Sequence, residues 1–331
     1  MKCIRCQHDC TYPQRSDRRC PSCRGEFAFE PRTGDRLSDM AFHRAIEHVS
    51  SGGHVRWGVE NLYYEICRRT RYSKVGGFFA SIVGIDTKLV RITPAEFERM
   101  WQRWLKTHGQ PTGVIVRTPQ PAQQRELESD IADYSFDRAV ICDRARTVDI
   151  LLANNFHFEN NCAVLSVEGY PPGPFAMVRD MLKRNPKLQA FALHDATLAG
   201  CRLARLLAND PQWFAGQTIV VDVGLRPNHA KPFRGLLIRS KDRNVQPGDG
   251  IRSDEVEWLS KYALELAAIR PEQILKRLFR AMTSQSDPAE STYFGTGDGG
   301  DGGATGGDVY VNADAFGADA DASDGGGDSF G

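Results

Sequence analysis

The sequence predicts an α/β protein with a parallel sheet, preceded by a small zinc ribbon and a helical unit and followed by an acidic tail. Three observations predict this architecture. Paired cysteines recur within residues 1–30, short apolar strands alternate with amphipathic helices from about residue 135, and glycine and aspartate dominate the C-terminal segment. With 331 residues, the chain is long enough for two compact domains with extra segments at its ends.

The N-terminal segment carries four cysteines in two C-x2-C pairs separated by 13 residues. They are Cys3, Cys6, Cys20 and Cys23. Two such pairs can place four thiolates tetrahedrally around Zn²⁺, and so small a segment cannot otherwise bury enough surface to fold. The alternative is a chance cluster of surface thiols, and His8 or Cys10 could replace one of the ligands. We expect a zinc ribbon over residues 1–30 whose ion is structural, because protein sulfurs fill all four positions.

Residues 37–110 show the pattern of a small helical unit. Ser38 precedes one helix that ends at the Gly52-Gly53 pair, and Thr93 and Pro94 open another that ends at Gly109. Between them, "NLYYEI" places its apolar and aromatic residues on one helical face. Small helices with short strands in this span predict a winged-helix type of domain. Residues 111–134 are expected to be a linker.

Strands and helices alternate from residue 135 to residue 283. Apolar runs at 138–142, 162–167, 188–193 and 217–223 are separated by amphipathic segments, and a helical region closes the domain. This alternation is typical of a Rossmann-like parallel sheet with right-handed crossovers. Residues 284–331 are expected to be a disordered tail, because a Gly- and Asp-rich composition cannot build a packed core.

Charge divides unevenly along the chain. The formal net charge is zero, but residues 295–331 contain eight aspartates and neither lysine nor arginine, so the remainder holds 42 basic against 34 acidic residues. A basic body with an acidic tail suits a nucleic-acid partner, although a solvated surface of this charge is also common.

The sequence shows no targeting or membrane segment. The start, "MKCIRCQHDC", lacks the apolar stretch of a secretory signal, and the best apolar run, at 75–85, is about half the length that spans a bilayer. We therefore expect a cytoplasmic protein without a membrane partner. In that compartment the nine cysteines are better interpreted as thiols and metal ligands than as disulfides.

Acidic residues follow the predicted strands at their carboxyl ends. Asp143, Glu168, Asp195 and Asp222 occupy these positions, and functional groups of such sheets collect at this edge. Several carboxylates together would offer the hard oxygen ligands that Mg²⁺ prefers. The alternative is that each acid only caps the helix that follows it.

Four motifs in this order resemble the Toprim domain of the topoisomerase VI A subunit and its meiotic double-strand-break relatives. They are "VICDRARTVDILLANN", "VEGYPPGPFAMVRDML", "ALHDATLAG" and "VVDVGLRP", and the resemblance covers roughly residues 38–228. It implies that Asp143 aligns with a metal-binding Glu and Asp195 with the first Asp of an Asp-x-Asp turn. It also implies a preceding winged-helix domain whose Tyr-Tyr pair matches Tyr63 and Tyr64, with Tyr64 as the nucleophile. The alternative is that the two tyrosines are an aromatic pair in the core of the helical domain.

The chain departs from the pattern of this family at three positions. Thr197 stands where the family has the second Asp of the turn, Glu60 where it usually has an Arg before the tyrosine pair, and Glu168 where it usually has a Lys. These changes alter the charge around a reaction in which Mg²⁺ and cationic groups offset phosphate charge. Glu168 could supply a replacement carboxylate for Mg²⁺.

We therefore expect a DNA-binding protein with a degenerate topoisomerase VI A-like core that does not cleave DNA. One alternative is a Mg²⁺-dependent transesterase that breaks strands through Tyr64 with Mg²⁺ on Asp143 and Asp195. Another is a protein-interaction scaffold that uses the ribbon and the tail. The resemblance also implies a homodimer with a separate ATPase subunit, and this chain contains no G-x-x-x-x-G-K-[ST] loop for binding a nucleotide itself.

Overall fold

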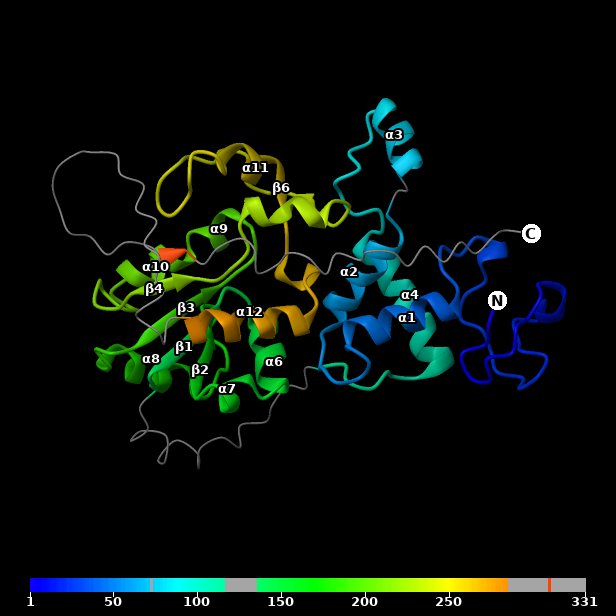
Figure 1. Cartoon of the computed structure of the whole chain (residues 1–331), viewed down its shortest axis with the longest axis horizontal. Coiled ribbons are helices and arrows are strands. Elements are labelled where there is room, and N and C mark those ends of the chain that lie inside the picture. The colour runs from blue at the N-terminus through cyan, green and yellow to red at the C-terminus, as the bar shows by residue number, and fades with distance from the viewer. Residues whose placement is uncertain (72–73, 117–135, 285–308, 311–331) are drawn as a thin grey trace.

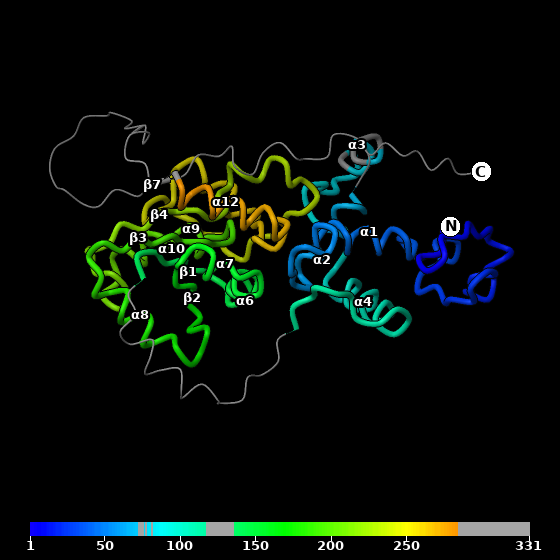
Figure 2. The backbone as a smooth tube through the Cα atoms, turned by 60° about the horizontal axis from the view of Figure 1, so that its bottom comes forward, coloured from blue at the N-terminus to red at the C-terminus, as the bar shows by residue number. Residues whose placement is uncertain are grey.

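The computed structural model describes residues 1–71, 74–116, 136–284 and 309–310. The ribbon and the sheet lie at opposite ends, with a helical unit between them (Figure 1 and Figure 2). Most of the expected linker, residues 117–134, lies outside the described residues. The same holds for the expected disordered tail, apart from Ser284 and Val309–Tyr310.

The ribbon contains two short loops that follow the same backbone course. Isolated antiparallel bridges join Lys2 to Asp9 in the first loop and Arg19 to Glu26 in the second. Short 3-10 turns accompany them, Pro13–Arg15 and Pro31–Thr33. A buried ion pair between Arg15 and Glu30, with Nε and Oε2 2.7 Å apart, connects the loops to the end of the ribbon.

Helices follow the ribbon in the described part of the chain. They are α1 (Asp39–Val49), α2 (Val59–Arg69), α3 (Lys74–Ile82) and α4 (Pro94–His108). Ser38 and Thr93 cap α1 and α4 through their side chains, as the sequence predicts. The described residues of 37–110 form no β-strand, only isolated bridges such as Leu89 to Leu237. The wing of a winged-helix domain is not found among them, and the winged-helix assignment stays a prediction.

A parallel sheet forms the second half of the chain, as the strand–helix alternation predicts. Its order is β2-β1-β3-β4-β7, and every neighbouring pair is parallel. The strands are β1 (Arg138–Cys142), β2 (Cys162–Ser166), β3 (Gln189–Leu193), β4 (Val220–Asp222) and β7 (Val309–Tyr310). The fifth strand therefore comes from the predicted tail and pairs with β4.

Helices cover both faces of this sheet. Along β1, Val140 and Cys142 face one core with α6 (Ala145–Ala153) and α12 (Pro271–Ser284), while Ala139 and Ile141 face a second core with α8 (Phe175–Arg184) and α10 (Leu203–Asn209). Burial on both faces explains why the strands are continuously apolar.

Shorter elements connect these helices. They are α7 (Phe156–Glu159), α9 (Leu198–Cys201), the 3-10 turn Pro227–Phe233, the pair β5 (Ile238–Arg239) and β6 (Tyr262–Ala263), α11 (Val256–Lys261) and the 3-10 turn Leu266–Ala268.

The helical unit and the sheet share one hydrophobic core. Residues of α1, α2 and α4 belong to the same buried cluster as Val140, Phe191 and the residues of α12. Asn61 of α2 fixes the junction, because its side-chain amide donates to the carbonyl oxygens of Ala267 and Ile269 at 3.1 and 3.3 Å. Among the helices that the structure describes, none combines the length and the apolar character that a membrane span requires.

Candidate functional site

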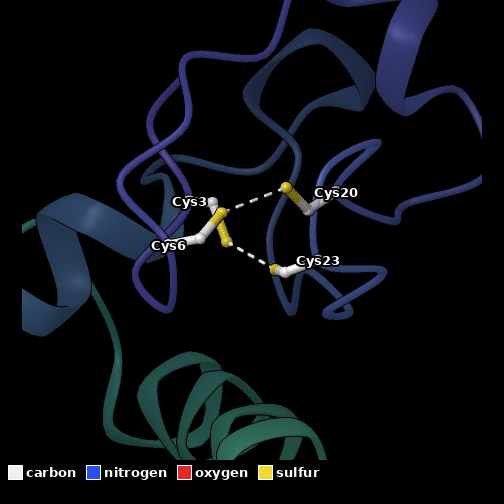
Figure 3. A group of neighbouring side chains, drawn as sticks. All are labelled: Cys3, Cys6, Cys20 and Cys23. Carbon is white, nitrogen blue, oxygen red and sulfur yellow. Dashed lines mark hydrogen bonds between the residues drawn. The ribbon is translucent and has the colours of Figure 1, made fainter.

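The four cysteines predicted as zinc ligands converge in the structure. Cys3 and Cys6 come from the first loop of the ribbon and Cys20 and Cys23 from the second (Figure 3). Sulfur atoms of Cys3 and Cys23 lie 3.6 Å apart, as do those of Cys6 and Cys20. All four ligand atoms lie within 4.8 Å of one another. Four sulfurs at about 2.3 Å from a tetrahedral Zn²⁺ would be roughly 3.8 Å apart, so the arrangement fits the ion.

The backbone conformation of the two loops places these sulfurs close together and affects their pKa values. The residues after the second cysteine of each pair, Gln7 and Arg24, have φ values of 58° and 59°, and their N–H groups donate to the carbonyl oxygens of Cys3 and Cys20. The N–H groups of Cys23 and Ser22 lower the pKa of Cys20 to about 6, which favours the thiolate that metals bind. Burial raises the pKa of Cys3 to about 12. A bound cation would oppose that effect.

Cys10 lies beside this cluster without belonging to it. Its sulfur is 3.8 Å from that of Cys20 and donates to the carbonyl oxygen of His8. Within the described ranges, the four paired cysteines form the one group of three or more potential ligands close enough to share an ion, and neither Cys10 nor His8 is among them. The predicted ligand set is therefore the one that the structure assembles.

A second candidate site lies at the carboxyl edge of the sheet. Asp143 follows β1 and Asp195 follows β3, and because these strands are neighbours the two acids meet. The backbone N–H of Asp195 donates to Oδ2 of Asp143 at 2.9 Å. Oδ1 of Asp143 is buried without a hydrogen-bond partner. Burial, together with the charge of Asp195, raises the pKa of Asp143 to about 7.

Two arginines from the start of α6 offset the charge of these acids. Arg144 places its Nε 3.5 Å from Oδ2 of Asp195 and a terminal nitrogen 3.5 Å from Glu168. Arg146 lies 3.9 Å from Asp195 and 3.2 Å from Glu265. Burial disfavours the charged form of Arg146, but the carboxylates of Glu265, Asp195 and Glu60 outweigh it and raise its pKa.

Glu168 contacts the start of α6, which precedes it in the chain, and not the helix that follows it. Its Oε2 accepts a hydrogen bond from the backbone N–H of Ala145 at 2.7 Å, at the first turn of α6, and its side chain is half exposed. The three acids Asp143, Glu168 and Asp195 do not form a ligand group comparable to the cysteines in the part of the chain that the structure describes. The expected Mg²⁺ site thus stays a prediction.

Tyr64 lies close to this edge but is buried. Only 1% of its surface is exposed, and its ring packs against that of Tyr63 with the centroids 4.9 Å apart. Burial, reinforced by the negative charges of Glu265 and Asp195, raises the pKa of Tyr64 well above 10. These groups oppose formation of the phenolate that a tyrosine nucleophile requires.

Thr197 and Glu60 are the other two positions that depart from the family pattern, and the structure shows what each side chain contacts or lines. Thr197 caps α9, with its hydroxyl oxygen accepting from the N–H of Gly200 at 3.0 Å. Glu60 lines a cavity of about 190 Å³ between α2 and α6, to which Arg146 and Asp149 also contribute.

Asp222, the fourth predicted carboxylate, is part of a buried ion-pair network. It accepts from His194 Nε2 at 2.9 Å and from Arg226 at 2.6 Å, and Arg226 also contacts Glu255 at 3.0 Å. His194 Nδ1 lies 2.8 Å from the carbonyl oxygen of Asp195, so both ring nitrogens face acceptors and the imidazolium form is favoured. Sequence reasoning missed His194, because nothing in the pattern shows that a partner 28 residues away lies beside it.

A cluster of cations gathers at the C-terminal end of α2. We call Arg68, Arg69, Arg71, Arg91 and Arg270 the α2 arginine cluster. The carboxylate of the buried Glu65 lies 3.2 Å from Arg68 and Arg270 and 3.8 Å from Arg69. Arg71 and Arg91 donate to the carbonyl oxygens of Arg68 and Thr70 at 3.0 and 2.9 Å and are exposed. Three of these arginines thus share the carboxylate of Glu65, and Arg71 and Arg91 lie at the same helix end, where the macrodipole also favours positive charge.

No protein-family model, curated protein or solved structure matches the chain. The resemblance to topoisomerase VI A subunits therefore has no support from these comparisons. The four-cysteine cluster, the carboxylate edge and the α2 arginine cluster are the features of the described residues that bear on function.

Proposed function

We propose that this chain is a zinc-containing protein that binds DNA without cutting it. The observation that supports this proposal is the α2 arginine cluster, in which five arginines gather at one helix end and two of them, Arg71 and Arg91, are exposed. An excess of positive charge on one surface attracts phosphates whatever the base sequence. Arg71 and Arg91 would make the contacts, because their side chains are exposed.

Binding without cleavage fits the surroundings of Tyr64. A buried phenol with a raised pKa cannot reach a phosphodiester from outside the protein, and the carboxylates beside it are already paired with Arg144 and Arg146. In the ribbon, four protein sulfurs would leave a zinc ion no open coordination position. That ion would stabilise the fold of the ribbon rather than take part in a reaction.

Titration of a labelled duplex at several salt concentrations tests the proposal. The intact chain should bind, and the logarithm of its affinity should fall linearly with the logarithm of salt concentration. In an Arg71→Ala/Arg91→Ala variant, the slope should decrease by about two, one for each lost phosphate contact. Arg184→Ala is the matched control, because Arg184 is an exposed arginine of α8 on another part of the molecule. Lack of binding by the intact chain at low salt would rule out the proposal.

A second candidate function, strand breakage through Tyr64, is favoured by one observation. Oδ1 of Asp143 is buried without a partner at the same edge where the charges of Asp195 and Glu265 act on Tyr64. This function requires a Mg²⁺-dependent covalent adduct between protein and DNA that Tyr64→Phe abolishes. We expect no adduct from either protein.

A further inference from the structure

One segment of the helical unit projects from the molecule and exposes apolar side chains. Helix α3 and the turn after it extend away from α1, α2 and α4 (Figure 1). We call Phe78, Phe79, Ile82, Val83 and Ile85 the apolar arm. Phe78 and Phe79 are 66% and 62% exposed, and their rings contact each other in an edge-to-face arrangement. The five side chains lie within eight consecutive residues, whereas the exposed Phe158 and Phe279 belong to other helices.

The arm has a firm base. The N–H of Val90 donates to the carbonyl oxygen of Leu237 at 2.9 Å, and Asp86 accepts from the hydroxyl of Tyr262 at 2.7 Å. These contacts fix the chain that returns from the arm to the sheet domain. The exposed apolar side chains therefore lie on a segment whose C-terminal end is fixed to the sheet domain.

The exposed apolar area of the arm is larger than that of single apolar side chains scattered over a protein surface. Two phenylalanines and three aliphatic side chains at this exposure present on the order of 500 Å² of apolar surface, near the upper end of what a typical monomer leaves in one patch. Patches of this size on globular proteins are commonly covered by a partner.

We propose that the apolar arm is a dimerisation surface that packs against the arm of a second copy of this chain. Residues 75–85 contain no charged side chain, so the arm itself offers nothing to a phosphate or a lipid headgroup. An uncharged apolar surface is complementary to itself, as an interface with twofold symmetry requires. Two arms together would bury roughly 1,000 Å², which reaches the lower limit for a specific interface.

The charges at the base of the arm make the proposed dimer respond to salt in a characteristic direction. Arg71, Lys88, Arg91 and Arg234 lie around this base, with the side chain of Arg71 against Gly235 and the N–H of Gly235 bound to the carbonyl oxygen of Lys88. Two copies joined at their arms bring like charges together. Salt screens that repulsion and leaves apolar contact intact, so the dimer should be as stable or more stable at high salt. Contacts with DNA or an anionic membrane would weaken instead.

Sedimentation equilibrium of the intact zinc-loaded chain tests the proposal. We expect a mass of twice 36.9 kDa at micromolar concentration, maintained from about 0.1 M to about 1 M salt. In a Phe78→Asp/Phe79→Asp variant, the dissociation constant should rise by about 30-fold or more, because two central apolar contacts are replaced by like charges. Phe158→Asp is the matched control, since Phe158 is 78% exposed on α7, and should leave the mass unchanged.

Three results would overturn the proposal. They are a monomeric intact chain at tens of micromolar, a dimer that the double substitution leaves unaffected, and a dimer that dissociates as salt increases. Circular dichroism and thermal unfolding of both variants distinguish loss of the interface from loss of the fold. The arm contributes little to the core, so both variants should unfold at the temperature of the unmodified chain.

Discussion

At the scale of single residues, His194 illustrates how one buried group organises its surroundings. The ring lies between Asp222 and the carbonyl oxygen of Asp195, and a Cβ atom on Gly224 would come within 2.4 Å of it. We expect Gly224→Ala to lower the free energy of unfolding by about 1–3 kcal/mol through overpacking. Measured by denaturant unfolding, Gly224→Ala should lower the free energy of unfolding less in a His194→Ala background, where the ring is absent, than in the intact chain. Equal costs in both backgrounds would contradict this steric explanation.

The same histidine should make stability depend on pH. Burial lowers the pKa of His194, but Asp222 and the neighbouring carbonyl outweigh burial and raise it above 6.5. A raised pKa in the folded state means that the stabilisation is complete below the unfolded value and is lost as pH rises through the folded value. The difference in melting temperature between the intact chain and His194→Gln should therefore shrink as pH rises above the unfolded value near 6.5.

His229→Gln is the control for this pH dependence. Burial, reinforced by the charge of Arg277, lowers the pKa of His229 to about 4, so this histidine stays neutral over the same range. Its unfolded-state pKa is near 6.5, so the intact chain should gain stability relative to His229→Gln as pH rises through that value, which is the opposite direction from His194. A difference for His194→Gln that does not shrink with rising pH would show that His194 is not an imidazolium in the folded state.

At the scale of elements, the ribbon should depend on its metal. Almost nothing but the cysteines and Phe27 forms a core there, so removal of the ion should unfold residues 1–27 while the sheet domain stays folded. Chelation followed by hydrogen exchange measures this directly.

Cysteine variants with metal analysis identify the ligands of that ion. Cys3→Ser/Cys20→Ser should reduce the zinc content from one ion per chain to none. Cys10→Ser should retain the ion, because Cys10 only lies beside the cluster. Zinc lost from Cys10→Ser and kept by the double variant would reverse the assignment of ligands.

Local patterns in the sequence predict the helices, the strands and the cysteine ligands well, but they do not predict contacts between side chains far apart in the chain. The cysteine spacing gives the ligand set, and the order of strands and helices gives a parallel sheet with Asp143 and Asp195 at one edge, but the pairing of β1 with β3 comes from the structure. The pairing of Asp195 with Arg144 and Arg146 could not be predicted, because it depends on where the start of α6 lies relative to β3. The sequence allowed burial of Tyr64 in the core of the helical domain as an alternative, but it could not show that this core continues into the sheet, because those contacts join residues far apart in the chain.

At the scale of the whole molecule, the uneven distribution of charge leads to a prediction about the tail. Residues 311–331 carry five of the eight tail aspartates, and a tethered anionic segment competes with phosphates at high effective concentration. Deleting these residues, which leaves β7 intact, should tighten DNA binding at low salt. The gain should fade as salt screens both interactions. Replacing the five aspartates by asparagine at unchanged length should have the same effect. Equal affinities of all three proteins would leave the tail without a role in binding.

The junction at Asn61 joins the helical unit to the sheet within a single buried cluster. A continuous core couples the two units in unfolding, so neither can lose its structure without exposing the apolar face of the other. Truncation between them would therefore yield fragments prone to aggregation rather than two independent modules. A substitution that destabilises α2 should therefore also destabilise the sheet that carries Asp143 and Asp195. Such a variant should be degraded faster in the cell than the intact chain.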